Sequence, residues 1–404
     1  MKRFKRIFTG IVAINMVITM MPLNSFKQEL DSLNLFASKE KINAETSTDG
    51  EYEYQLISGT TAKIVKYNGN DSKLEIPEKV EGYSVVEISV GAFSGNISLT
   101  SVKLPSEILT LAGEAFSNCV MLESVVFPEK ISSIGTGAFS GCLKLDNVKI
   151  PASIISVGPN AFSSCKSLKT VELADKSINV PDNFLNGCTS VQKVILPATL
   201  TNIGQGAFYG CSSLSDIILP DKIENIKASA FQGCSLLKKV TIPQVTKNIG
   251  SSAFSGCSSL ASVVLNEGLA VIEQNAFYGC SSLTEMIIPS TVNAVGTSVF
   301  AECKKLEKVT LQQGMLRVPN NLLSGCSSVK NVIIPDTVTD IGENAFNGCT
   351  SIEKIVLPDA LLTIGSTAFY NCKGLLEINL KEGITTIGNS AFQGCSMLKK
   401  IVFP

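Results

Sequence analysis

The 404-residue chain contains no histidine. The Ser-His-Asp and Cys-His arrangements for nucleophilic catalysis are therefore impossible, and zinc centres that use histidine are excluded with them. Paired carboxylates could still hydrolyse glycosides, but the acidic residues are scattered over variable positions that we expect to face solvent, as at Glu123, Asp146, Glu307 and Glu353. We expect no enzymatic activity and no cofactor.

Positive charge is also scarce. Beyond residue 44 the chain holds 27 basic and 32 acidic side chains, a net charge of −5, and Arg317 is the single arginine there. Nucleic-acid binding needs clusters of lysine and arginine that displace counterions from phosphates. We therefore expect no nucleic-acid partner.

Long apolar runs are absent after the N-terminus, so we expect no later membrane span, which takes about 20 apolar residues. At the N-terminus a shorter apolar run, from Ile7 to Met21, follows a basic cluster and resembles a secretory signal peptide. We predict that residues 1–44 are a leader, with Ala37 and Ala44 as alternative cleavage points, and that the chain is secreted or displayed at the cell surface. An uncleaved N-terminal anchor is the alternative.

The chain does contain a strict period, which its cysteines mark. All thirteen occupy near-copies of one sequence context, and each follows the previous one by 23 residues. A unit of this size cannot bury its own apolar face and must stack on its neighbours, so the period predicts a solenoid. The cysteines are Cys119, Cys142, Cys165, Cys188, Cys211, Cys234, Cys257, Cys280, Cys303, Cys326, Cys349, Cys372 and Cys395.

Each repeat reads Cys-x-x-Leu-x-x-Val-x-Leu-Pro, then a polar stretch, then Ile-Gly-x-x-Ala-Phe-x-Gly. The segment after the leucine alternates with period two, as in residues 98–105, and its β-branched residues suit a strand. Stacking in register predicts one long parallel sheet. We expect the Ile-Gly pair to bring a second apolar side chain inward on the opposite wall, with glycine freeing the backbone to turn, and the phenylalanines to stack in the core.

Two repeats depart from this pattern in the same way. They read VPDNFLNGC at 180–188 and VPNNLLSGC at 318–326, so proline replaces the glycine and Phe-Leu or Leu-Leu replaces Ala-Phe. One interpretation is a volume-conserving exchange in the core with a local kink. The other is a functional bend or interface.

The repeat resembles the BspA-type leucine-rich repeat, also called the Treponema pallidum type, with its hallmark Ile-Gly-x-x-Ala-Phe-x-x-Cys-x-x-Leu-x-x-Ile-x-Ile/Leu-Pro. The resemblance covers residues 83–404. It implies a leucine-rich-repeat solenoid, mainly β, in which about fourteen 23-residue repeats form a right-handed coil with a long parallel β-sheet and little helix.

The segment 52–88 is similar to the lead-in that usually precedes such arrays. We predict a β-hairpin capping segment at residues 45–82 that covers the first open edge of the array at 83–404. No counterpart closes the other end, where Pro404 follows a finished strand. We therefore expect that the C-terminal cap is missing and that the native protein continues.

The thirteen cysteines allow four interpretations. Disulfides are usual in exported proteins, but stacked turns about 4.8 Å apart with parallel side chains do not suit disulfide geometry, and an odd number leaves one thiol unpaired. A metal site needs converging ligands, as in Cys-x-x-Cys pairs, which do not occur. A nucleophilic thiolate lacks a histidine to lower its pKa. We predict a structural ladder of buried thiols without metal.

Outward positions of the strands form a column rich in valine and isoleucine. It either stabilises the ladder by packing between neighbouring strands or faces a ligand, since contiguous exposed apolar surface often marks an interaction site. A column of mixed charge runs beside it, from Lys193 and Asp216 to Glu377 and Lys400. The seven candidate ligand-facing residues, here called the aliphatic stripe, are Val126, Ile195, Ile218, Val264, Ile287, Ile333 and Val356.

The resemblance implies a bacterial cell-surface or secreted protein that mediates adhesion, often to host matrix proteins or to other microbes. The residues themselves agree with export, an extended binding surface for extracellular protein partners and no catalysis. The alternative is a structural spacer that holds a further, downstream domain away from the cell.

Overall fold

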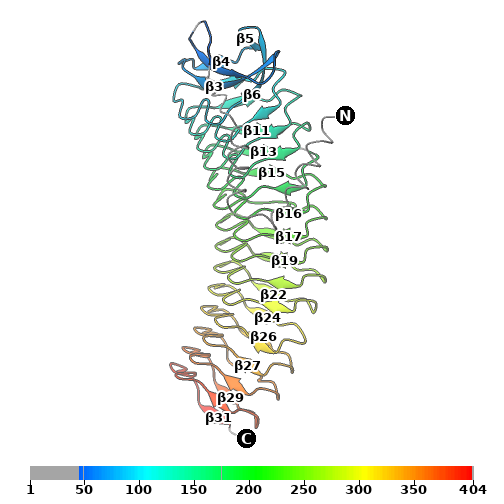
Figure 1. Ribbon diagram of the computed structural model, residues 1–404. Coiled ribbons are helices and arrows are strands. Elements are labelled where there is room, and N and C mark those ends of the chain that lie inside the picture. Colours follow the sequence, from blue (N-terminus) through cyan, green and yellow to red (C-terminus); the bar gives the residue numbers. More distant parts are fainter. Residues whose placement is uncertain (1–44, 49, 174, 403–404) are drawn as a thin grey trace, which may run out of the picture. The chain divides into compact units, whose positions relative to one another are not determined.

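The computed structural model describes residues 45–48, 50–173 and 175–402, and these contain strands and turns but no helix (Figure 1). The predicted leader, residues 1–44, lies outside them. From Thr46 onward the chain is one compact unit, in which successive turns lie on one another. The predicted solenoid of 23-residue turns is confirmed, because paired residues of neighbouring turns differ by 23 in number, as in Val148, Val171 and Val194.

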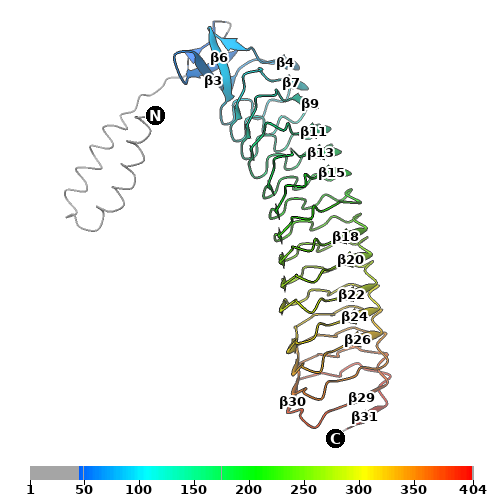
Figure 2. The ribbon, with the colours of Figure 1, turned by 90° about the vertical axis from the view of Figure 1, so that its right-hand side faces the viewer.

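One side of the stack consists of the strands that follow the repeat's leucine, and we call it the leucine wall (Figure 2). Its strands pair in parallel. They are β4 (Lys73–Glu75), β7 (Ser101–Lys103), β9 (Ser124–Val126), β11 (Asn147–Lys149), β13 (Thr170–Glu172), β15 (Lys193–Ile195), β18 (Lys239–Thr241), β20 (Ser262–Val264), β22 (Glu285–Ile287), β24 (Lys308–Thr310), β26 (Asn331–Ile333), β29 (Glu377–Asn379) and β31 (Lys400–Val402).

A second set of strands, each of two residues and most ending in isoleucine or valine, forms the isoleucine wall. These strands also pair in parallel with a 23-residue offset. They are β8 (Thr110–Leu111), β10 (Ser133–Ile134), β12 (Ser156–Val157), β14 (Asn179–Val180), β16 (Asn202–Ile203), β17 (Asn225–Ile226), β19 (Asn248–Ile249), β21 (Val271–Ile272), β23 (Ala294–Val295), β25 (Arg317–Val318), β27 (Asp340–Ile341), β28 (Thr363–Ile364) and β30 (Thr386–Ile387).

Neither wall is one uninterrupted sheet, which refines the expectation of a single long sheet. The leucine wall divides into β4-β7-β9, β11-β13-β15, β18-β20, β22-β24-β26 and β29-β31. On the isoleucine wall the strands β6-β8-β10-β12, β14-β16-β17-β19-β21-β23 and β25-β27-β28-β30 are each continuous. The interruptions fall at different turns on the two walls, so every pair of neighbouring turns from β7 to β31 keeps paired residues on at least one wall.

The first strands have a different arrangement. Antiparallel β2 and β3 form a hairpin whose β3 then pairs in parallel with β6 and so leads into the isoleucine wall. The division into a capping segment at 45–82 and an array at 83–404 stays a prediction. The strands here are β1 (Glu45–Thr46), β2 (Tyr52–Leu56), β3 (Thr61–Tyr67), β5 (Lys79–Val80) and β6 (Tyr83–Ile88).

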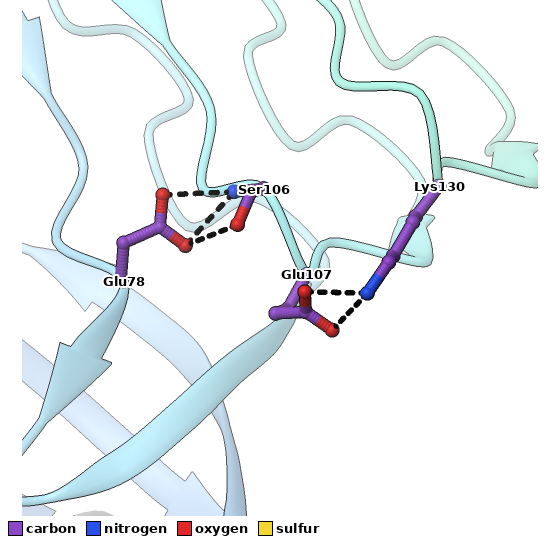
Figure 3. Close-up of polar contacts among 4 residues, drawn as sticks. All are labelled: Glu78, Ser106, Glu107 and Lys130. Carbon is purple, nitrogen blue, oxygen red and sulfur yellow. Dashed lines mark hydrogen bonds and ion pairs between the residues drawn. The ribbon is translucent and has the colours of Figure 1, made fainter.

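Polar contacts join this N-terminal segment to the first turns (Figure 3). The Glu78 carboxylate accepts hydrogen bonds from the backbone N–H and hydroxyl of Ser106, at 2.9 and 2.8 Å. These bonds hold the pKa of Glu78 below its ordinary value. One turn further on, the Lys130 ammonium lies 2.5 Å from the Glu107 carboxylate. Neighbouring turns are thus held together at their surface as well as in the core.

The core contains the predicted stack of phenylalanines, one from most turns. Phe116 and Phe139 lie 5.4 Å apart between ring centres with planes 2° from parallel, and Phe231 and Phe254 lie 5.1 Å apart. Such pairs contribute about 0.5–1.5 kcal/mol beyond the burial of their area. The stack therefore stabilises the contact between turns rather than any single turn.

The expected role of glycine in the Ile-Gly pair is wrong. Gly135 and Gly250 do not have positive φ angles, and a Cβ on Gly250 would lie 2.6 Å from the backbone nitrogen of Ala228 in the preceding turn. Glycine stands there because the backbones approach closely. The chain turns instead two and six residues later, at positions such as Gly137 (φ 62°) and Gly141 (φ 74°).

Candidate functional site

The aliphatic stripe lies at the surface of the leucine wall. Every one of its seven side chains is exposed, from 40% at Ile195 to 82% at Ile218. The residues on either side of each stripe position along the strand point inward, as with Val194 and Leu196 around Ile195. This alternation follows from the two-residue period of a strand. The wall therefore presents a discontinuous line of exposed aliphatic side chains to solvent.

The pairing of these residues bears on the two interpretations of the stripe. Within the paired strands, Val126 faces Lys103, Ile195 faces Glu172, and Val264 faces Thr241. Thr310 lies between Ile287 and Ile333 in the same way. In the described residues no two stripe members are paired with each other.

Stripe members do occupy neighbouring turns at three places, and at each place the strand pairing is interrupted. Ile195 and Ile218 are one such pair, and the others are Val264 with Ile287 and Ile333 with Val356. The stripe residues therefore do not pack continuously on one another along a ladder of paired strands. The adjacent aliphatic side chains lie instead where the backbone ladder is open.

A hollow of about 770 Å³ in the surface of the leucine wall adjoins Ile218. The segment Asp216–Ile218 makes no strand, although its turn keeps its place between β15 and β18. The hollow is lined by Ile195 and Ile218 and by charged residues from two turns, among them Lys193 and Asp221. It thus combines an apolar surface with charges of both signs.

The charged column beside the stripe is partly neutralised by ion pairs between turns. Lys308 lies 2.9 Å from Glu285, and Lys354 lies 3.5 Å from Glu377. Exposed pairs of this kind contribute little to stability, about 0–1 kcal/mol. Lys193 and Asp216 line the hollow beside Ile218. In the described part of the chain they take part in no ion pair, so these two charges are available to a partner.

The thirteen cysteines lie on the inside of the stack. Twelve are buried and Cys395 is partly exposed. Each Sγ donates a hydrogen bond to a backbone carbonyl 26 residues earlier, as from Cys257 to Phe231 at 3.2 Å and from Cys326 to Phe300 at 2.9 Å. Burial raises the pKa of Cys257 and Cys303 to about 12. These thiols are therefore neutral at ordinary pH, and no group of metal-binding side chains occurs among the described residues.

The family model for the BspA type leucine rich repeat region matches residues 86–215, 178–307 and 316–404, in six copies. These segments cover most of the chain. It belongs to the BspA-type leucine-rich repeat family.

Two solved structures are similar to this BspA-type chain. A leucine-rich repeat protein from Bacteroides ovatus is 31% identical, with a TM-score of 0.80, and the alignment covers 87% of this chain and 92% of that one. A leucine-rich cell surface protein from Faecalibacterium prausnitzii is 25% identical, with a TM-score of 0.55 and coverage of 89% and 94%. No curated protein matches the chain.

The sequence analysis missed a regular polar feature of the BspA-type array, a ladder of asparagine amides on the isoleucine wall. Each amide nitrogen donates to the amide oxygen one turn earlier, from Asn202 to Asn179 at 2.8 Å, Asn225 to Asn202 at 2.9 Å, and Asn248 to Asn225 at 3.0 Å. The signal was available, because asparagine stands in one slot of four consecutive repeats.

Proposed function

We propose that this BspA-type protein is a secreted or surface-displayed binding protein that serves adhesion and contacts extracellular protein partners through its leucine wall. The observation that carries the proposal is the aliphatic stripe, whose adjacent members lie beside open junctions instead of packing along a paired ladder. Exposed apolar side chains in such an arrangement, flanked by charges, fit the apolar centre and polar rim of a protein interface.

Ile218 is the centre of the proposed surface. Its side chain is 82% exposed and adjoins the 770 Å³ hollow, which Lys193 and Asp216 also line. An aliphatic side chain of a partner would fill the hollow while its charged neighbours contact these residues. Interfaces of this kind depend on a few central side chains.

Export is supported by the signal-like N-terminus, and surface display by the resemblance to adhesive surface proteins. The neighbour from Faecalibacterium prausnitzii carries the name of a cell surface protein. Within the residues that the structure describes, no helix has the length and apolarity that a membrane crossing requires.

A non-catalytic role is part of the proposal. The chain has no histidine, and burial holds the pKa of thiols such as Cys119 and Cys257 at about 12, far from that of a nucleophile. Two of the acidic residues considered for a catalytic pair contact a lysine of the next turn instead: Asp146 lies 2.8 Å from Lys169, and Glu307 lies 3.6 Å from Lys330.

Replacing Ile218, Val264 and Ile287 together with threonine tests the proposal. Threonine keeps the β-branched shape but removes apolar surface, so we expect the melting temperature to stay within a few degrees. Proteins that the wild-type chain captures from a solubilised epithelial surface and matrix extract should bind at least about tenfold more weakly, a loss of ~1.4 kcal/mol.

The matched control carries threonine at Leu109, Ile155 and Leu362, which are exposed by 47%, 80% and 45% but lie on the isoleucine wall. It should capture the same proteins as the wild-type chain. Equal capture by the stripe variant would contradict the proposal. Absence of specific capture by any form would instead favour the spacer, and a large fall in melting temperature of the stripe variant would favour the packing interpretation.

A further inference from the structure

The isoleucine wall is interrupted at the turn that contains Pro181. In the ordinary turns, the residue after each strand donates its N–H to the carbonyl one turn earlier, as Gly204 does to Val180 at 2.9 Å and Gly250 does to Ile226 at 2.8 Å. Pro181 occupies this slot and has no N–H to donate. Accordingly, β12 and β14 are not paired and belong to different sheets.

The same interruption recurs six turns later. Pro319 occupies the equivalent slot, and β23 and β25 are likewise unpaired. A second bond is absent at both places: Thr201 donates its N–H to Ile178 at 2.8 Å in an intact junction, but the N–H groups of Ile178 and Leu316 have no backbone acceptor within the described ranges. Each interruption therefore extends over the whole width of the strand.

The aromatic stack ends at the same two turns. The rings of Phe139 and Phe162 are 3° from parallel, whereas Phe162 and Phe184 meet at 88°. The parallel stack resumes at Phe208, runs to Phe300, and is interrupted again by Leu322 and Leu323 before Phe346. Thus the core contact that links the turns most regularly changes wherever the isoleucine wall opens.

Both openings are hollowed at the surface. The first, of 590 Å³, lies between Ile155 and Ile178, whose side chains are 80% and 62% exposed. The second, of 660 Å³, adjoins Leu316, which is 65% exposed. The space left between these turns is therefore not filled by side chains.

The leucine wall, by contrast, is closed at both places. Val148 pairs with Val171 across the first opening, and Met286 pairs with Val309 across the second. The segments just before the phenylalanines also stay bonded, since Asn160 donates to Asp182 and Ser298 donates to Asn320, each at 3.0 Å. The turns are thus attached along the leucine wall and free along the isoleucine wall.

We propose that the β12–β14 and β23–β25 junctions are two flexible joints, which divide the array into three stiff stacks of turns. Each joint opens and closes on the isoleucine wall, and the paired leucine wall is its hinge. In a solenoid the contact between neighbouring turns sets the local stiffness, and a junction that lacks backbone bonds and parallel ring stacking on one side is its most compliant point.

The proposed joints do not depend on the proposed binding function, but their bending would change the shape of the proposed binding surface. Opening a joint on the isoleucine wall bends the array toward the leucine wall, so the parts of the aliphatic stripe carried by different stacks would change their angle to one another. A partner that spans a joint could therefore select one bend from several.

Hydrogen exchange of the full chain tests the joints directly. Peptides that contain the N–H groups of Ile178 and Leu316 should exchange at least about tenfold faster than those of Thr201 and Glu224 in closed junctions, because an amide without an acceptor needs no opening of a hydrogen bond. Equal protection at all four positions would overturn the proposal.

Distance distributions between paired labels, attached through unnatural amino acids, provide the second measurement. Labels at Ser132 and Thr201 span the first joint, and labels at Glu224 and Asn293 span the same number of residues across closed junctions. We expect the first distribution to be the wider. Equal widths would show that the openings are rigid.

A variant can also create a joint. Glu273 occupies the slot of Pro181 and donates its N–H to Ile249 at 2.9 Å. The Glu273 carboxylate also accepts the backbone N–H of Ser251 at 2.9 Å, and both Glu273→Pro and Glu273→Ala remove this bond. Glu273→Pro should therefore speed exchange between β19 and β21 about tenfold relative to Glu273→Ala, which keeps the backbone N–H. If proline had no more effect than alanine there, the missing donor would not be the cause of the openings.

Discussion

At the scale of the residue, each buried cysteine links two turns of the stack. Its sulfur fills a site with no exposure, and its thiol donates to the backbone of the preceding turn, as Cys257 does to Phe231 at 3.2 Å. The strict period made a ladder of thiols predictable, because stacked turns repeat their side-chain directions. The carbonyl acceptor was not predictable, since it depends on the path of a loop that the repeat pattern does not define.

The neutral thiols make the stability of the array depend on pH. Burial raises the pKa of Cys119, Cys257 and Cys303 from about 9 to about 12. Below pH 8 both folded and unfolded chains hold these protons, so the free energy of unfolding is insensitive to them. Between pH 9 and 12 only the unfolded chain loses them, which costs up to ~1.4 kcal/mol per thiol for each pH unit.

We therefore expect thermal melts to be constant from pH 6 to 8 and to fall steeply above pH 9. A variant with alanine at Cys234, Cys257 and Cys280 should be less stable at pH 7 but should lose less stability between pH 9 and 11. If both chains showed the same slope, other groups would be responsible for it.

At the scale of the element, the isoleucine wall is built from strands of two residues, each of which contributes little stability by itself. Their parallel pairing, the close approach of backbones at glycine and the asparagine ladder act together across turns. The break at Pro181 could be read from the sequence, because proline lacks the donor that Gly204 uses in the next turn. The break at Asp216–Ile218 could not, since these residues are as suited to a strand as Lys193–Ile195, which forms one.

The asparagine ladder gives a prediction for this wall. Asn225 donates to Asn202 and accepts from Asn248, so Asn225→Ala removes two amide hydrogen bonds at a half-buried site. The free energy of unfolding should fall by about 1–2 kcal/mol. Asn293→Ala, at an exposed position on the same wall, should change it by less than about 0.5 kcal/mol. Equal effects in urea titrations would mean that the ladder adds no stability.

At the scale of the whole molecule, one period fixes the fold. A constant offset of 23 residues places every cysteine, and the leucine and phenylalanine of most repeats, on its counterpart, which is why the solenoid and its family could be predicted without coordinates. The continuity of the walls could not be predicted in this way. Whether two strands bond depends on small displacements between turns, and these arise from local loops such as that of Asp216–Ile218.

The positions of the candidate binding residues could also be predicted from the sequence, but the pairing of their strands could not. Alternation along the strand was enough to place Ile218, Val264 and Ile287 outward, and the structure exposes them by 82%, 49% and 57%. The sequence did not show that the strands of neighbouring stripe members are unpaired, as those of Val264 and Ile287 are. Only the structure revealed this. Their part in binding stays a prediction, which the threonine variants test.

The in-register stack with its dry column of thiols is the central claim, and counting reactive thiols by mass spectrometry tests it most directly. In native buffer without reductant, iodoacetamide should modify at most Cys395, the one cysteine that is not buried. After unfolding in denaturant, still without reductant, all thirteen should be modified. Rapid labelling of many thiols in the native chain, or fewer than thirteen labels after unfolding, would contradict the stack described here.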